Sequence, residues 1–479
     1  MKNLHLSLTL VAALAFGLCS ATAAESSEAQ LIAVLKSNAS QKEKADACRA
    51  LAHVGSKDAV PALAALLGDE QLSHMARYGL ETLPGPAVDQ ALRDALATLK
   101  GRQLAGVITS LGVRRDANAV KPLTKFLQDA DPDVASAAAR ALGDIATKDA
   151  ATALEAALAS GAAANQLAVC EGLFRCAEAF AKAGRAKDAA SVYDRLRKLP
   201  DAAHQVRAGA LRGAILARGK DGVSLLAEAL RGDDWVLADA AARTAMELPG
   251  NAVTKTLTDE LLNRSLSADR QILVLQTLGK RADTTALPAV LAATRGGYAN
   301  VCLVAIRTVA EIGDASAAPV LAELACDANR EISETARQSL ASLPGKKVDE
   351  AVLALLANPD SKTKLAGLQL VAMRRMVSAV PALQKATTDG DPQVRAAALK
   401  YLAEFGGEPE LPGLLTQLEN ASDAQTRAAV ESALGTLCNR IGKPDVCADK
   451  LTARLAQATP ATKAALLRVL GSVGGAKAL

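Results

Sequence analysis

A strict internal repeat is the feature of this sequence that most limits how it can fold. An apolar residue near the end of a helical segment recurs with a 31-residue period at Leu80, Leu111 and Leu142. The same spacing returns at Leu278, Val309, Leu340, Val371 and Leu402, and Ala245, Leu434 and Leu470 continue the phase with small insertions. Because one short unit cannot bury its own apolar face, this recurrence predicts units stacked along a continuous core.

Each unit contains the start and stop signals of two helices. Asp131-Pro132 and Asp391-Pro392 open one helix, with the aspartate as N-cap and proline at the first helical position. We expect that helix to stop and turn at a glycine, at Gly112, Gly143, Gly279 and Gly471. A proline in the first turn marks the other helix, at Pro61, Pro122, Pro288, Pro319 and Pro381. The sequence therefore predicts an all-α protein.

The unit resembles a HEAT repeat of the short, phycobilisome-lyase-like kind. Its Asp-Pro-x-Val-Arg opening is most complete at Asp391-Pro392-Gln393-Val394-Arg395. The resemblance covers residues 28–479 and implies an armadillo-like α-solenoid, a right-handed superhelix of about fourteen antiparallel helix pairs. Such repeats serve many functions, so the resemblance implies no particular activity.

One unit departs from this pattern and divides the chain. Residues 165–200 resemble a tetratricopeptide repeat at Leu173, Phe180, Gly184, Ala189, Tyr193 and Pro200. A peptide-binding element is one interpretation, but a longer helical pair that adjusts curvature explains a single such unit more simply. We expect HEAT-like repeats at 25–164 and 201–479, the last of them incomplete.

The segment 1–24 has the pattern of an export signal. Lys2 precedes an apolar stretch from Leu4 to Leu18, and Ala21-Thr22-Ala23 has the small-x-small form of a cleavage site. We expect cleavage near Ala23-Ala24 and a periplasmic or secreted protein. A lipoprotein attached at Cys19 is the alternative, although Leu18 is larger than the residue favoured there. No later stretch is long and apolar enough for stable membrane insertion.

Composition and motifs argue against several functions. Aromatic residues make up 2% of the chain, and 55 Lys and Arg nearly balance 51 Asp and Glu, so we expect no nucleic-acid partner. No Walker loop, G-x-S-x-G or H-E-x-x-H occurs. Ser361–Lys364 matches S-x-x-K but follows Asp360 as a capped helix turn would, and Asp129, Asp131 and Asp133 are better explained by capping than by calcium binding. We expect no catalytic, cofactor or metal site.

Seven cysteines follow the signal, and two pairs are candidate disulfides. Cys438 and Cys447 flank the turn at 441–444, and Cys302 and Cys326 are equidistant from the turn near Gly313. Antiparallel helices would place the members of each pair nearly level. An exported protein permits such bridges.

Charged residues also recur in phase with the apolar residue. Two positions before it stand Arg140, Arg243, Arg307 and Lys400, and two positions after it stand Asp144, Glu247, Glu311 and Glu404. Ion pairs between side chains one helical turn apart on the same helix are the simpler interpretation. A basic stripe that binds an anionic partner is the other. The candidate partner-binding residues are Arg140, Arg243, Arg307 and Arg395.

These features predict a scaffold or adaptor that presents an extended surface to a protein partner. The alternative is the front portion of a longer exported enzyme, because Gly474–Leu479 begin a helix that earlier units complete. A chromophore lyase follows only from the name of the repeat, and export and the missing nucleophile argue against it.

Overall fold

In a computed structural model, residues 27–160, 165–263 and 266–475 are described, and the regular structure within those ranges is helical with no strand. The predicted signal at 1–24 lies outside them. The chain divides into two compact units, Met1–Arg218 and Gly219–Leu479. This boundary lies beyond both predicted changes of repeat type, at 164 and at 200.

The first unit contains twelve α-helices among its described residues. They are α1 (Glu28–Lys36), α2 (Gln41–Val54), α3 (Val60–Ala64), α4 (Ser73–Thr82), α5 (Pro86–Ala95), α6 (Gly101–Val113), α7 (Val120–Thr124), α8 (Pro132–Ile145), α9 (Lys148–Ala159), α10 (Gln166–Lys182), α11 (Ala186–Arg197) and α12 (His204–Arg218).

The second unit contains sixteen α-helices in its described part. They are α13 (Val223–Arg231), α14 (Trp235–Glu247), α15 (Asn251–Leu262), α16 (Ala268–Arg281), α17 (Leu287–Ala293), α18 (Ala299–Ile312), α19 (Ala318–Leu324), α20 (Arg330–Ser342), α21 (Lys346–Leu356), α22 (Ser361–Arg374), α23 (Val380–Ala386), α24 (Pro392–Phe405), α25 (Leu411–Glu419), α26 (Ala424–Ile441), α27 (Pro444–Leu455) and α28 (Pro460–Val473).

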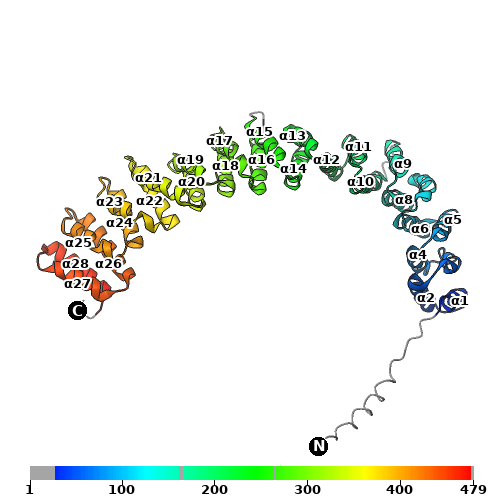
Figure 1. The fold of residues 1–479 in the computed structure, drawn as a ribbon, viewed down its shortest axis with the longest axis horizontal. Coiled ribbons are helices and arrows are strands. Elements are labelled where there is room, and N and C mark those ends of the chain that lie inside the picture. The colour runs from blue at the N-terminus through cyan, green and yellow to red at the C-terminus, as the bar shows by residue number, and fades with distance from the viewer. Residues whose placement is uncertain (1–26, 161–164, 264–265, 476–479) are drawn as a thin grey trace, which may run out of the picture. The chain divides into compact units, whose positions relative to one another are not determined.

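Within each unit the helices pack as pairs, an odd-numbered helix with the even-numbered helix that follows it. The even-numbered helices also contact one another in sequence, α2 through α12 in the first unit and α14 through α28 in the second (Figure 1). We call each of these series an even row. Six pairs in the first unit and eight in the second confirm the predicted α-solenoid architecture. Counted in this way, α27 and α28 form the last described pair.

The residues that set the repeat form the core of the even rows. All eight residues of the strict phase, from Leu80 to Leu402, are at most 1% exposed. Ala245, Leu434 and Leu470 are buried as well. Burying a Leu or Val side chain contributes about 1.5–3 kcal/mol. The predicted core positions are therefore confirmed.

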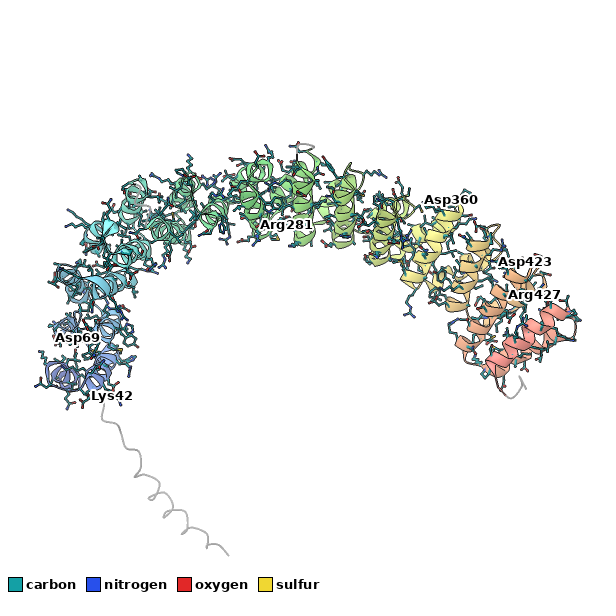
Figure 2. The ribbon with its side chains drawn as sticks, turned by 180° about the vertical axis from the view of Figure 1, so that it is seen from behind. Lys42, Asp69, Arg281, Asp360, Asp423 and Arg427 are labelled. Carbon is teal, nitrogen blue, oxygen red and sulfur yellow. The ribbon has the colours of Figure 1, made fainter. Side chains whose placement is uncertain are left out.

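The predicted helix starts are also confirmed. Asp131 and Asp391 accept hydrogen bonds from backbone N–H groups at the starts of α8 and α24, each with proline at the first position. Asp360 and Asp423, labelled in Figure 2, cap α22 and α26 in the same manner. These side chains satisfy N–H groups that lack a partner within the helix.

The glycines play a different part from the one predicted. Gly112, Gly143, Gly279 and Gly471 lie inside α6, α8, α16 and α28 and do not end them. The prediction of a helix stop at these positions is wrong. A Cβ at Gly143 would lie 2.7 Å from the Cα of Gly172, and one at Gly112 would lie 2.7 Å from the Cα of Ala141. At these two positions the glycine lets neighbouring even helices approach closely.

A second device joins neighbouring repeats. Leu83-Pro84-Gly85, Leu248-Pro249-Gly250 and Leu343-Pro344-Gly345 each link an even helix to the next odd helix, with the glycine at positive φ. An arginine lies three positions after the buried phase residue of the following even helix, at Arg114, Arg281 and Arg374. The guanidinium of Arg114 donates to the carbonyl oxygens of Leu83 at 2.7 Å and Gly85 at 3.3 Å. We call this contact the arginine clamp.

The other two clamps are built in the same way. Arg281 donates to the carbonyl oxygens of Leu248 at 2.9 Å and Gly250 at 3.2 Å. Arg374 donates to those of Leu340, Ala341 and Leu343. The last carbonyl oxygens of a helix accept no hydrogen bond within that helix. In each clamp, the arginine of one even helix donates to such carbonyls at the end of the preceding even helix.

The unit at 165–200 is the helical pair formed by α10 and α11. Leu173, Phe180, Ala189 and Tyr193 are buried, and Gly184 has φ +73° between the two helices. The rings of Phe174 and Tyr193 lie 6.1 Å apart. The seventeen-residue α10 is longer than most even helices. The pair packs against α8, α9 and α12 within the same stack.

Candidate protein-binding surface

Three of the four predicted partner-binding residues occupy one position of the repeat. Arg140, Arg243 and Arg307 lie two positions before the buried residue of α8, α14 and α18. All three are exposed on an even row. This position of the repeat therefore lies on the surface, as predicted. The side chains with which the three arginines interact differ from one arginine to the next.

Arg140 belongs to a network that joins two helices. Its Nε lies 3.2 Å from Glu171 of α10, and Arg175 of α10 contacts both Glu171 at 2.7 Å and Asp144 of α8 at 2.6 Å. Burial raises the pKa of Glu171, but hydrogen bonds from Arg175 and Arg140 outweigh it, and the net pKa is lowered. Asp144 thus pairs with an arginine of the next even helix, in place of the predicted partner on its own helix.

The other two exposed arginines differ from each other. Arg243 pairs with Asp239 at 2.8 Å, one turn earlier on the same helix, and its side chain is 73% exposed. Arg307 makes no ion pair or hydrogen bond with any described residue. A surface pair such as Arg243–Asp239 contributes at most about 0.5 kcal/mol to stability. Two of the three cations are therefore neutralised locally.

Arg395 occupies a different part of the repeat. It lies in the first turns of α24, where its Nη1 donates to the carbonyl oxygens of Asp389 at 2.8 Å and Gly390 at 2.9 Å. Arg427 of α26 donates in the same way to Ala421 at 2.9 Å. The arginine of the Asp-Pro-x-Val-Arg opening closes the preceding loop, so the structure does not bring it together with the exposed arginines.

The S-x-x-K segment is a helix start, as expected. Asp360 accepts from the backbone N–H of Thr363 at 2.8 Å. Lys364 forms an ion pair with Asp389. No group of three or more metal-binding side chains occurs in the ranges that the structure describes. Within the same ranges, no helix has the length and apolarity to cross a membrane.

The seven cysteines of the described chain are present as free thiols. Cys438 and Cys447 are buried together, with the Cys447 Sγ 4.0 Å from the carbonyl oxygen of Cys438. Burial and a hydrogen bond with the Cys447 thiol raise the pKa of Cys438. Cys302 instead donates to the carbonyl oxygen of Thr294 at 2.9 Å. The two bridges stay predictions, and the geometry favours the first.

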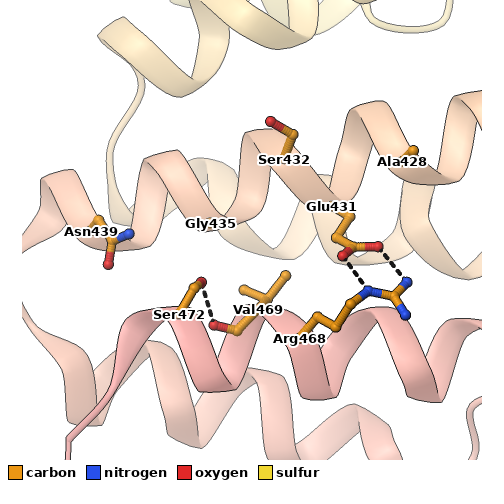
Figure 3. Close-up of a pocket in the computed structure, with 8 residues that line it drawn as sticks. All are labelled: Ala428, Glu431, Ser432, Gly435, Asn439, Arg468, Val469 and Ser472. Atoms are coloured by element: carbon orange, nitrogen blue, oxygen red, sulfur yellow. Dashed lines mark hydrogen bonds and ion pairs between the residues drawn. The ribbon is translucent and has the colours of Figure 1, made fainter.

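A pocket of about 560 Å³ lies between α26 and α28 (Figure 3). It exists because Ala428 and Gly435 leave little side chain between the two helices. Its charged residues are already paired, since Arg468 and Glu431 form a two-pronged ion pair at 2.6 and 2.8 Å. The hydroxyl of Ser472 donates to the Val469 carbonyl at 2.7 Å. This pocket therefore offers few unused polar groups to a ligand.

A second hollow surrounds Trp235, the single tryptophan of the chain. It is an open hollow of about 450 Å³ at the start of α14 and along α16. It is lined by Trp235, Asp269, Ile272, Leu273 and Gln276. This site was not among the residues predicted from the sequence. The available signal was a lone tryptophan directly after two aspartates at a predicted helix start.

Comparison with known proteins supports the repeat assignment. The family described as HEAT repeats matches residues 101–173 and 348–435, less than half of the chain. These two segments lie in different units and include several of the stacked helix pairs. No curated protein matches the sequence.

Several solved structures match this chain with low sequence identity. A chain of the Kap95p structure with RanGDP is 14% identical, with a TM-score of 0.40, and the match covers 93% of this chain and 68% of that one. Kap121p is 12% identical, with a TM-score of 0.39, and the match covers 94% of this chain and 62% of that one. Human deoxyhypusine hydroxylase is 16% identical, with a TM-score of 0.25, and the match covers 53% of this chain and 97% of that one.

Proposed function

We propose that this protein is an exported scaffold or adaptor that binds a protein partner along an even row. One observation carries the proposal. The position two before the buried residue is exposed at all eleven places, eight in the strict phase and three that continue it: Tyr78, Thr109, Arg140, Arg243, Gln276, Arg307, Gln338, Gln369, Lys400, Ser432 and Arg468. The core is uniform from repeat to repeat, whereas the residue at this exposed position changes at eight of the ten steps.

A varied surface on a uniform core supports recognition of a partner that is not itself repetitive. Stacked repeats need only their buried residues and their turns to be stable. The exposed position is therefore free to take the chemistry that a partner requires. Solenoids offer an extended surface of this kind, and the HEAT repeats at 101–173 and 348–435 support the architecture.

We also propose a binding role in place of catalysis, and a location outside the cytoplasm. The first rests on a sequence without a recognised catalytic motif. The second rests on the signal pattern at 1–24, which predicts a chain that begins near Ala24. Sequencing the N-terminus of the protein isolated from cell fractions tests both the cleavage and the compartment.

The binding role is tested by crosslinking the protein in intact cells and isolating it under native conditions. We expect one companion protein in a fixed ratio to the chain. Reversing Arg140, Arg243 and Arg307 to glutamate reduces that ratio if these exposed positions carry the contact. An isolated chain without a companion in every condition tested contradicts the proposal.

A further inference from the structure

Trp235 is poorly buried for a residue of its kind. It is the first residue of α14, and 51% of it is exposed. A tryptophan can bury about 150–250 Å² on folding. Half of that area is left in water here, although the rest of the unit buries most of its large apolar side chains.

The exposed ring is nonetheless held in place. The guanidinium of Arg270 lies 4.6 Å from the centre of the Trp235 ring, a cation–π contact. Arg270 is only 7% exposed, and its Nη2 donates to the carbonyl oxygen of Gly232 at 3.0 Å. Its Nη1 has no hydrogen-bond partner. The Trp235 ring is therefore fixed by Arg270, a buried side chain whose Nη1 donates no hydrogen bond.

Two hollows meet at this ring. The first has Ile272 and Leu273 of α16 as its apolar part, together with the Gln276 amide. The second is an open hollow of about 300 Å³ and is lined in part by Asp233, Ser267 and Arg270. Trp235 and Asp269 line both hollows. The combined site is therefore apolar in one hollow and polar in the other.

The net charge of the residues lining the two hollows is negative. Arg231 is neutralised by Glu260 through two contacts of 2.9 Å, whereas Arg270 keeps its positive charge, because the ring and the Gly232 carbonyl are neutral, and it is outweighed by two carboxylates. Asp233 and Asp269 are exposed and form no ion pair with a described residue. Two carboxylates that pair with no described residue therefore line the hollows, beside an aromatic ring and an apolar wall. Such a site complements a cation that is carried on an aliphatic stem.

We propose that the hollow at Trp235 binds an extended segment of a partner protein through a lysine or arginine side chain. The aliphatic stem packs on Ile272 and Leu273. The charged head lies between Asp233 and Asp269, next to the ring. This inference rests on the proposed function and specifies the chemistry of one contact.

The single tryptophan makes the test direct, because the tryptophan fluorescence of the full chain reports on this site alone. The probe is a short blocked peptide with a central arginine flanked by alanine and leucine. We expect its titration to change the Trp235 emission in a saturable manner, more weakly at high salt. The same peptide with a central glutamate should produce at least a fivefold weaker response.

Variants separate recognition from folding. Asp233→Asn with Asp269→Asn should weaken binding of the arginine peptide at least fivefold, and Ile272→Ser, which removes apolar contact without adding a charge, should weaken it as well. Asp445→Asn, a remote surface change on α27, is the matched control and should bind as the wild type does. Circular dichroism checks that each variant keeps its helices.

Three results overturn the inference. They are equal responses to the arginine and glutamate peptides, a response to a neutral oligosaccharide with none to the arginine peptide, and unchanged binding after removal of both carboxylates. If crosslinking in cells still finds a companion while the Trp235 site fails in this way, the scaffold role stands and only this contact is rejected.

Discussion

Arg374 of α22 lies 2.7 Å from Asp349 of α21, and the same guanidinium donates to the Leu343 carbonyl at 2.6 Å, in the link that follows α20. One side chain therefore holds three successive helices. Its side chain is 9% exposed, so the contacts are shielded from water. Arg114 and Arg281 occupy the same place in their repeats, and burial lowers the pKa of Arg281.

Removing this clamp should destabilise the stack locally. We expect Arg374→Ala to cost about 3 kcal/mol, because it leaves several carbonyl oxygens and Asp349 without their partner. Hydrogen exchange should accelerate at residues 340–350. Lys385→Ala, at an exposed residue of α23, is the control and should change stability by less than about 0.5 kcal/mol. Equal effects from the two variants would show that the clamp contributes nothing.

The glycines allow a second comparison between equivalent positions. Gly143→Ala places a Cβ 2.7 Å from the Cα of Gly172, so α8 and α10 must separate. We expect a loss of about 2 kcal/mol despite the higher helix propensity of alanine. Gly471 occupies the same phase in α28, and a Cβ there meets nothing within 4 Å.

Gly471→Ala should therefore leave stability unchanged or raise it by up to about 1 kcal/mol. Denaturant unfolding of both variants checks the pair. Destabilisation of similar size at the two positions would rule out close helix approach as the reason for the glycine.

The buried cysteine pair predicts a response to oxidation. The thiols of Cys438 and Cys447 are hydrogen-bonded to each other, so we expect a bridge between them in the protein isolated from an oxidising compartment. Alkylation before reduction, followed by peptide mass analysis, should find a linked peptide that disappears on reduction. Full alkylation of Cys438 and Cys447 without reductant contradicts this expectation.

A helix cap should contribute to the pH dependence of stability. Hydrogen bonds from Ser361 and then from the backbone N–H groups of Gln393 and Val394 lower the pKa of Asp391. The folded pKa lies below the unfolded value of about 3.9, so the ionised cap stabilises α24 above that pH and its contribution is lost as the pH falls through the folded pKa.

Asp391→Asn keeps a capping side chain that does not ionise. We expect the thermal midpoint of this variant to fall less between pH 7 and about pH 3 than that of the wild type. Parallel changes in the two proteins would mean that the charge of the cap makes no contribution.

The repeat could be predicted because its signals are local. The constant spacing identified the core from Leu80 to Leu402, and Asp-Pro identified helix starts, since both depend on residues within one helix. The role of Gly143 and the partner of Asp144 could not be read in the same way, because each depends on a residue of the next repeat.

The arginine clamp could be predicted from the sequence only in part. Three of the four Leu-Pro-Gly segments are followed 31 to 33 residues later by an arginine, as Leu343 is by Arg374, whereas the fourth, at 411–413, begins α25 and is not, so the sequence contains the association only in part. That the arginine donates to the Leu-Pro-Gly link could be inferred only once the structure showed that the two segments are in contact. The hollow at Trp235 needed the same knowledge, since Arg270 belongs to the next even helix along the chain.

The central claim is that an even row meets a protein partner, and site-specific photocrosslinking in cells tests it most directly. A photoreactive residue is placed at Arg307 or Gln338 on exposed positions of α18 and α20, and at Lys255 or Lys385 on exposed positions of the odd helices α15 and α23. We predict one discrete crosslinked product from the even-row positions and none from the odd-helix positions. Crosslinks confined to the odd helices, or absent from all four, contradict the account.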